Sequence, residues 1–180
     1  DDDKEDNYTS LKQLIVDIDN QDNSEYTQRN RLARLDYTDF LPISKMYRFS
    51  NAFNTFFGDI NFDRIENIDN EKVILFKKND KDVPIDGLST GEKQIVFRGA
   101  YLLKNSGKMD EGVAFIDEPE LSMHPSWQRK ILDYFRNLYT DTTTHNQKAQ
   151  LFFASHSEYV VASALKNPND VIVIVLTEIG

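Results

Sequence analysis

The stretch VAFIDEPELSMHP, residues 113–125, joins a short apolar segment to a group of acidic side chains. Its first four residues are apolar without interruption, which is typical of a parallel strand that is covered on both faces. Asp117 and Glu118 follow directly. Two adjacent carboxylates at the end of such a strand indicate a group that faces a cation or a reacting water. The alternative is that they only cap the next helix, whose start is interrupted by Pro119 and Pro125.

The segments on either side predict an α/β fold. From Ser89 onward we expect a helix, the strand at 112–117, a helix at 125–139, a strand at 150–155, a helix at 158–165 and a strand at 170–176. This alternation favours a parallel sheet with helices packed on its faces. Ligands of open parallel sheets bind at the carboxyl ends of the strands, where Asp117 and Glu118 are expected.

The first half of the chain has a different pattern. We expect an acidic tail or tag remnant at residues 1–7 and a short helix at 8–18, followed by a polar loop at 19–30. A second helical stretch at 31–57 is predicted to break at Pro42 and to end at Gly58. Two strands are then expected at 62–68 and 72–78, with a turn at 78–84. The predicted organisation is therefore the tail 1–7, a helical segment 8–58 and an α/β part 59–180.

The stretch DGLSTGEKQ, residues 86–94, places small residues where a helix is about to begin. Ser89 and Glu92 have the spacing of a capping box, in which each side chain accepts a hydrogen bond from the backbone N–H of the other. A helix start with free N–H groups is also a binding site for phosphate. The two interpretations are compatible, and this stretch does not decide between them.

The predicted strand at 150–155 leads into Ser155, His156 and Ser157. A histidine at this point could hydrogen-bond a phosphate or an attacking water, or it could serve only as a structural residue near a helix cap. The stretch lacks the G-x-S-x-G pattern of a serine hydrolase, so we exclude that class.

Three motifs in one order carry a resemblance to a known family. LSTGEKQ (88–94) resembles the signature motif of ABC-type ATPases, VAFIDEP (113–119) resembles their Walker B motif with its catalytic glutamate, and ASHS (154–157) resembles their switch-histidine loop. ELSMHP (120–125) takes the place of the D-loop. The stretch DEPELSMHP (117–125) resembles more narrowly the soluble ABC-like AAA ATPases, which are relatives of the RecF, SMC and overcoming-lysogenization-defect groups. The resemblance covers residues 71–176 and implies the C-terminal half of a three-layer P-loop NTPase.

The resemblance also implies site residues and cofactors, namely ATP and Mg²⁺. Asp117 would bind Mg²⁺, Glu118 would be the general base, and His156 would sense or position the γ-phosphate. In an ATP-bound dimer, the signature motif would contact the γ-phosphate held by the opposite subunit. The residues of this motif are Ser89, Thr90, Gly91 and Glu92, with Thr90 standing where transporters usually have Gly.

A Walker A loop, G-x-x-x-x-G-K-[ST], is missing from the sequence. Gly107 and Lys108 form the only Gly-Lys pair, but Met109 follows, and Leu102 stands where the first glycine should be. We therefore expect this chain alone to be inactive and to be part of a longer or split ATPase. A homodimer, or an N-terminal half bearing Walker A, would complete it. The segment 8–57 would be an arm inserted between the two halves, and an exposed strand edge would favour self-association.

Composition limits the other classes. The formal net charge is −9 over 180 residues, which argues against direct binding of nucleic acid by this segment because such binding needs clustered Lys and Arg. The chain has no cysteine, and His124, His145 and His156 are too scattered to indicate a zinc site. No apolar run approaches the ~20 residues of a membrane span, so we expect a cytoplasmic protein without a membrane partner.

Two functional hypotheses follow, and a third is weaker. The first is an ATPase module that acts as a nucleotide-gated dimer and drives an effector or nuclease domain or subunit. The alternative is a non-catalytic half that supplies the signature helix in trans to another chain. The third is a metal-dependent nuclease built on Asp117, Glu118 and Glu120. The cellular process is not specified by these motifs.

Overall fold

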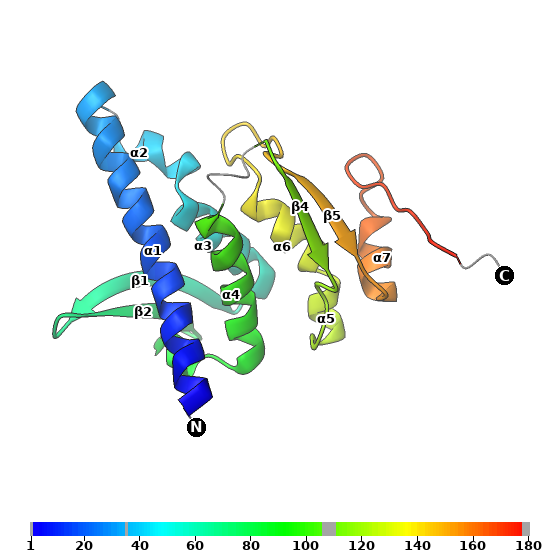
Figure 1. Cartoon of the computed structure of the whole chain (residues 1–180), viewed down its shortest axis with the longest axis horizontal. Helices are drawn as coiled ribbons and strands as arrows, with labels where there is room; N and C mark the ends of the chain where they lie inside the picture. The colour runs from blue at the N-terminus through cyan, green and yellow to red at the C-terminus, as the bar shows by residue number, and fades with distance from the viewer. Residues whose placement is uncertain (1, 35, 106–110, 178–180) are drawn as a thin grey trace.

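The computed structural model describes residues 2–34, 36–105 and 111–177 and arranges them as helices around two small sheets (Figure 1). Gly107 and Lys108 lie outside the described residues. The α/β class is confirmed, because β4 (Val113–Asp117) and β5 (Gln150–Ala154) pair in parallel and helices precede and follow them.

Helix α1 (Asp2–Ala33) is longer than predicted. The expected polar loop at 19–30 is wrong, and the expected tail is helical from Asp2 onward. Leu11, Ile15 and Ile18 form the buried stripe of the helix, and Asp22 continues it at the same spacing with 6% of its surface exposed. The periodic signal stopped at Ile18 because the next core-facing residue is an aspartate rather than an apolar side chain.

The second helical stretch, predicted at 31–57, breaks and ends at the predicted residues but begins later, because residues 31–33 belong to α1. It consists of α2 (Tyr37–Phe40), the 3₁₀ turn η1 (Leu41–Ile43) that contains Pro42, and α3 (Lys45–Phe57). Gly58 ends α3 with a φ of 80°, a left-handed conformation that glycine adopts without a steric penalty. The buried phenylalanines of α3 join the core of the protein.

A three-stranded antiparallel sheet follows, with the order β1-β2-β3. The two predicted strands are confirmed as β1 (Ile60–Ile68) and β2 (Glu71–Lys78). The expected turn at 78–84 is wrong in its second part, because Lys81–Pro84 forms β3 against β2. Asn79 and Asp80 both have positive φ, so the reversal needs only two residues and leaves the rest free to pair. The 3₁₀ turn η2 (Ile85–Gly87) leads to the next helix.

Helix α4 (Thr90–Lys104) occupies the centre of the molecule and contacts α1, α3 and α6 (Ile131–Leu138) (Figure 1). Ile95, Val96 and Leu103 are buried in these contacts. The expectation that the helix is buried almost all round is wrong on one side. Phe97 and Tyr101 stack there on each other, and they are 43% and 53% exposed because no described element covers that face.

The parallel pair carries helices on one face. Phe153 of β5 packs against Phe135 of α6, whereas Phe115 of β4 and Phe152 of β5 stack on each other on the opposite face. Phe115 is 81% exposed, so the expectation of a strand covered on both faces is wrong for this side. The single helix predicted at 125–139 is two, α5 (Pro125–Gln128) and α6.

The end of the chain differs from prediction in one element. Helix α7 (Glu158–Ala164) is confirmed, but the strand expected at 170–176 is wrong: this segment forms no ladder with any described strand. Val171 and Val173 pack against the core while Ile172 and Ile174 are exposed. The alternation is that of an extended chain, but a strand also needs backbone hydrogen bonds to a neighbour.

Candidate functional site

A cavity of about 370 Å³ opens at the carboxyl ends of the parallel strands. Asp117 ends β4 and is paired with Ala154, which ends β5, so the turns that follow both strands lie next to each other. The cavity is lined by residues from these two turns and from α5: Glu118, Glu120, Leu121, Ser122, Gln128, His156 and Ser157. This is the position at which open parallel sheets bind their ligands.

Glu118 enters the cavity through an unusual backbone conformation. Its N–H donates a hydrogen bond of 2.9 Å to the carbonyl oxygen of Ala154, which extends the pairing of the two strands by one residue. Its φ is 42°, in the left-handed region that non-glycine residues rarely adopt. Such a conformation costs about 1–3 kcal/mol and persists where the surrounding structure enforces it, often at functional sites. The structure therefore brings the predicted general base and the predicted switch histidine, His156, to one cavity.

Asp117 lies at the exposed end of β4 but does not line the cavity. Among the described residues, no group of three or more His, Cys, Asp or Glu side chains is arranged to hold a metal ion. Mg²⁺ in nucleotide sites is usually held by one or two carboxylates, with water and substrate phosphates as the remaining ligands. A single carboxylate such as that of Asp117 fits this mode of binding and does not fit a site made of protein ligands alone.

The loop after β5 is anchored on both sides of His156. The hydroxyl of Ser155 donates to Glu120 Oε1 at 2.6 Å, and the backbone N–H of His156 donates to the same oxygen at 3.2 Å. Ser157 caps α7 and donates to Gln128 Oε1 at 2.6 Å. The side chain of His156 is exposed. Sequence reasoning missed this use of Glu120, because neither periodicity nor motif spacing indicates which residue a buried acid will contact.

The start of α4 is a capping box, as predicted. Ser89 Oγ accepts from the backbone N–H of Glu92 at 3.3 Å, and Glu92 Oε2 accepts from the backbone N–H of Ser89 at 2.7 Å. Glu92 is buried, and its other oxygen pairs with Lys78 Nζ at 2.9 Å. Burial raises the pKa of Glu92, but the hydrogen bonds from Lys78 and Ser89 outweigh it, so the pKa lies below its ordinary value. Both carboxylate oxygens of Glu92 therefore bond within the protein.

The remaining signature residues do not line the cavity. Ser89 and Thr90 are exposed at the start of α4, and Gly91 packs on the ring of Trp127 in α5. Helix α5 thus contacts the start of α4 through Trp127, and it contacts the loop of residues 155–157 through Gln128. In Figure 1 the start of α4 and the carboxyl end of β4 both face the lower side of the molecule.

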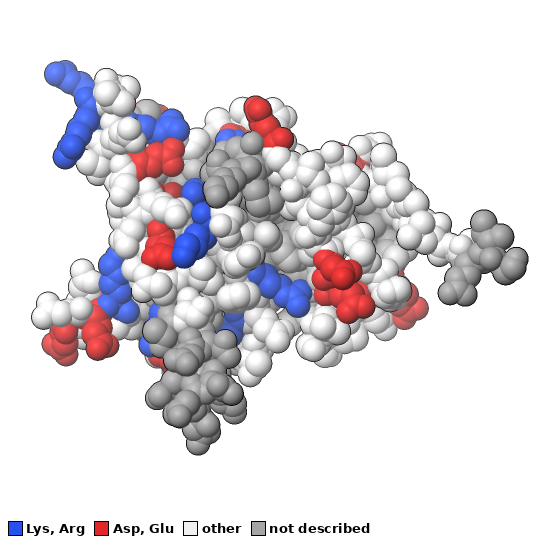
Figure 2. Space-filling model, in the orientation of Figure 1, with Lys and Arg blue, Asp and Glu red and all other residues white. Residues whose placement is uncertain are grey.

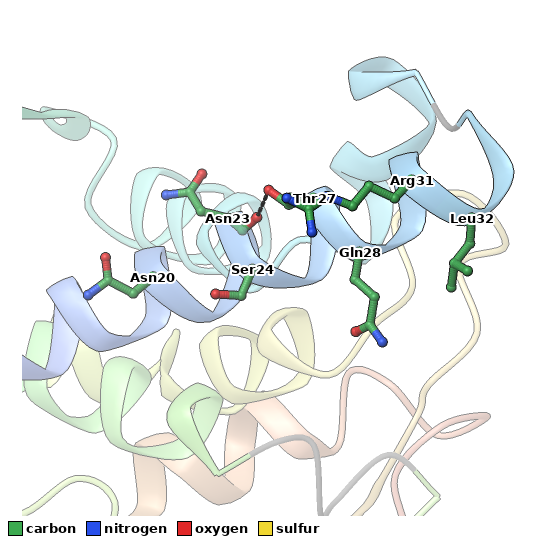
Figure 3. A pocket seen from close by; sticks show the side chains of 7 residues that line it. All are labelled: Asn20, Asn23, Ser24, Thr27, Gln28, Arg31 and Leu32. Atoms are coloured by element: carbon green, nitrogen blue, oxygen red, sulfur yellow. Dashed lines mark hydrogen bonds between the residues drawn. The ribbon is translucent and has the colours of Figure 1, made fainter.

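A larger hollow of about 680 Å³ lies elsewhere, along one face of α1. Figure 3 shows that its side chains come from this single helix, and that Thr27 hydrogen-bonds the backbone of Asn23. The lining residues are Asn20, Asn23, Ser24, Thr27, Gln28, Arg31 and Leu32. They offer no carboxylate or imidazole, so this hollow lacks the acid–base groups found at the end of β4.

The face of the molecule seen in Figure 2 carries both signs of charge, with Lys and Arg interspersed among Asp and Glu. Among the helices that the structure describes, none has the length and apolar composition needed to cross a membrane. Of the two hollows described, the one at the end of β4 holds the acid–base side chains, and it is therefore the candidate site.

A comparison with models of protein families identifies the family of this chain. Residues 3–162 match the family model described as "AAA domain, putative AbiEii toxin, Type IV TA system". Curated proteins gave no match. One solved structure, from work on ATP-driven dimerization and DNA-stimulated activation of SMC ATPases, is similar over 68% of this chain and 73% of its own, with 13% identity and a TM-score of 0.48.

Proposed function

We propose that this chain, which belongs to the AAA-domain family whose model matches residues 3–162, is the catalytic C-terminal part of an ABC-type ATPase. The observation that carries this proposal is that Glu118 and His156 line one cavity at the carboxyl ends of two parallel strands. ATP hydrolysis is supported both by the matched family and by the two acid–base groups at the ligand-binding edge of the sheet. The substrate is ATP, and the products are ADP and phosphate.

In this proposal the chain's own residues act on the attacking water. Glu118 accepts a proton from the water as it attacks the γ-phosphorus, a role for which its exposed carboxylate at the cavity wall is suited. His156, on the opposite turn, donates a hydrogen bond to the γ-phosphate and so orients it. Asp117 would hold Mg²⁺, and the bound ion would supply neutralisation of the charge on the phosphate oxygens.

The phosphates need a Walker A loop, which this sequence does not contain. The proposed assembly is a nucleotide-gated dimer in which the start of α4 approaches ATP held by another subunit. Ser89 and Thr90 present an exposed, capped helix N-terminus there, whose dipole and free N–H groups attract anions. Hydrolysis would release the pair and act on an effector or nuclease domain or subunit. We place this module in the cytoplasm, without direct contact to nucleic acid.

A second candidate function is a non-catalytic half that supplies only the signature helix. The capped start of α4 favours it, because that feature serves a partner's ATP without any chemistry at Glu118. An in-frame G-x-x-x-x-G-K-[ST] in the coding sequence before Asp1 would favour the first function. Its absence there would favour the second.

Calorimetric titration with Mg²⁺–ATP tests whether the ATP site forms only when a Walker A segment or subunit completes it. We expect no detectable binding to the 180-residue chain, and binding when a segment or subunit bearing Walker A is present. Asp117→Ala should then weaken binding at least about tenfold, since it removes a ligand of the metal. Asp39→Ala, at an exposed position on α2, is the matched control and should bind like the unmodified chain. Tight binding by the chain alone would contradict the proposal.

A further inference from the structure

Glu120 is a buried acid that the proposed reaction does not use. It lies two residues after Glu118 in the turn that follows β4, and only 9% of its surface is exposed. A buried carboxylate is expensive to keep unless hydrogen bonds or a nearby positive charge compensate it. Its contacts therefore indicate what the residue does.

One oxygen of Glu120 holds the loop that carries His156. Oε1 accepts from the hydroxyl of Ser155 at 2.6 Å and from the backbone N–H of His156 at 3.2 Å. These two bonds tie the turn after β4 to the turn after β5. Among the described residues, the imidazole of His156 has no hydrogen-bond partner, so its position depends on how its backbone is held.

The other oxygen of Glu120 is buried without a hydrogen-bond partner among the described residues. A neighbouring positive charge comes from Arg98 of α4, which is partly buried and donates to the carbonyl oxygen of Pro119. Burial lowers the pKa of the Arg98 guanidinium, and the negative charge of Glu120 opposes that shift. Arg98 therefore links the centre of α4 to the turn that contains Glu118 and Glu120.

The second anchor of the loop lies beyond His156. Ser157 donates to Gln128 of α5, and Gln128 in turn donates to the carbonyl oxygen of Met123 at 2.9 Å. Glu120 and Gln128 both come from the segment that follows β4, and both line the cavity. The histidine loop is thus held on its two sides by one segment, with its one buried charged anchor at Glu120.

We infer that Glu120 is a positioning residue, which holds the loop of residues 155–157 against the end of β4 so that His156 faces the cavity beside Glu118. This inference rests on the proposed function, because the γ-phosphate is the group that His156 would contact. It goes beyond that function in naming a residue that acts only through another. Glu120 itself touches neither water nor phosphate in this account.

The first test needs no nucleotide. Amide hydrogen exchange of residues 155–157 in the 180-residue chain should become at least about tenfold faster in Glu120→Ala, because both bonds to Oε1 are lost. Glu120→Gln keeps an accepting oxygen and should stay within about threefold of the unmodified chain. Glu158→Ala, an exposed acid at the start of α7, is the control and should leave the loop unchanged. Unchanged exchange in a folded Glu120→Ala would overturn the inference.

The second test is kinetic and uses the chain together with Walker A. Glu120→Ala should lower kcat about tenfold with KM changed less than about twofold, and Glu120→Gln should restore most of kcat. His156→Ala in the Glu120→Ala background should cause little further loss, since both changes remove the same contact. Independent, multiplicative losses would contradict the inference. If Glu120→Ala does not fold, Ser155→Ala removes the hydroxyl bond to Oε1 and also the bond from the Ser157 N–H to the Ser155 hydroxyl. The readout is then the amide of His156 alone, which should exchange faster than in the unmodified chain; unchanged exchange there would count against the inference.

The two tests separate this inference from the proposed function. Suppose that residues 155–157 exchange faster in Glu120→Ala and that the unmodified assembly does not hydrolyse ATP. This result would support the anchoring by Glu120 and refute the proposed ATPase function. ATP hydrolysis by the unmodified assembly, combined with unchanged exchange of residues 155–157 in Glu120→Ala, would support the proposed function and refute the anchoring by Glu120.

Discussion

Gly91 illustrates how one residue can meet two requirements. As part of the signature motif it is predicted to contact phosphate, which needs close approach of the backbone. In the structure, a Cβ atom placed on Gly91 would lie 2.7 Å from Cζ3 of the Trp127 ring. The packing of α4 on α5 therefore requires glycine at this position, whether or not a phosphate binds there.

The first prediction concerns this contact. Gly91→Ala should destabilise the protein by about 1 kcal/mol, because overpacking against the rigid indole outweighs the higher helix propensity of Ala. Denaturant unfolding of the 180-residue chain measures the change. Thr90→Ala, at the exposed neighbouring position, is the control and should stay within about 0.5 kcal/mol of the unmodified chain. A Gly91→Ala variant more stable than the unmodified chain would show that Trp127 moves aside freely.

At the scale of elements, Asp22 joins two helices. Its carboxylate accepts from the hydroxyl of Ser44 at 2.6 Å and from the backbone N–H groups of Lys45 and Met46 at 3.0 and 2.8 Å. An aspartate of α1 thus caps the start of α3. This contact explains why α1 continues through a stretch whose composition predicts a loop.

The second prediction tests that cap. Asp22→Ala should destabilise the protein by about 2–4 kcal/mol, since three donors at the start of α3 lose a charged acceptor. For a chain of this size, this corresponds to a fall in Tm of about 4–16 °C. Asn23→Ala, at an exposed position of α1, provides the comparison and should have little effect. Equal Tm values for the two variants would contradict the role of Asp22.

The third prediction concerns pH and the start of α4. The pKa of Glu92 is lower in the folded protein than its ordinary value of 4.5. The unfolded chain therefore takes up the proton first, so the stabilisation by Glu92 is complete above its unfolded pKa and is lost as pH falls through the folded pKa. Unfolding free energies measured from pH 7 down to 3 should show this loss. Lys78→Met, which removes the ion pair, should make the acid decline shallower; an unchanged slope would exclude the pair as its cause.

Local signals predicted the elements that local chemistry determines. The capping box at Ser89, the break at Pro42 and the end of α3 at Gly58 all depend on neighbours in sequence, and all are confirmed. The continuation of α1 through Asp22 depends on Ser44, in another element. The anchoring of His156 by Glu120 depends on contacts between turns that follow different strands. Sequence periodicity carries no information about such contacts.

At the scale of the whole molecule, the parallel sheet has one face that the described elements leave exposed. Phe115 and Phe152 stack on a face that no described helix covers, and Ile172 and Ile174 are 88% and 77% exposed. Parallel sheets are usually covered on both faces. The strands predicted at 112–117 and 150–155 are confirmed at 113–117 and 150–154. The expectation that both faces are covered is wrong, because the elements that cover a sheet need not be adjacent to it in sequence. The exposed face is consistent with a module that works as part of a larger assembly.

The most direct test of the account combines hydrolysis and assembly in the Glu118→Gln variant, with a Walker A segment or subunit present. We predict that this variant binds Mg²⁺–ATP, persists as a dimer in sedimentation experiments, and hydrolyses ATP at least about a hundredfold more slowly than the unmodified protein, because the general base is lost. Hydrolysis by Glu118→Gln at the unmodified rate would contradict the assignment of Glu118 and, with it, the proposed site.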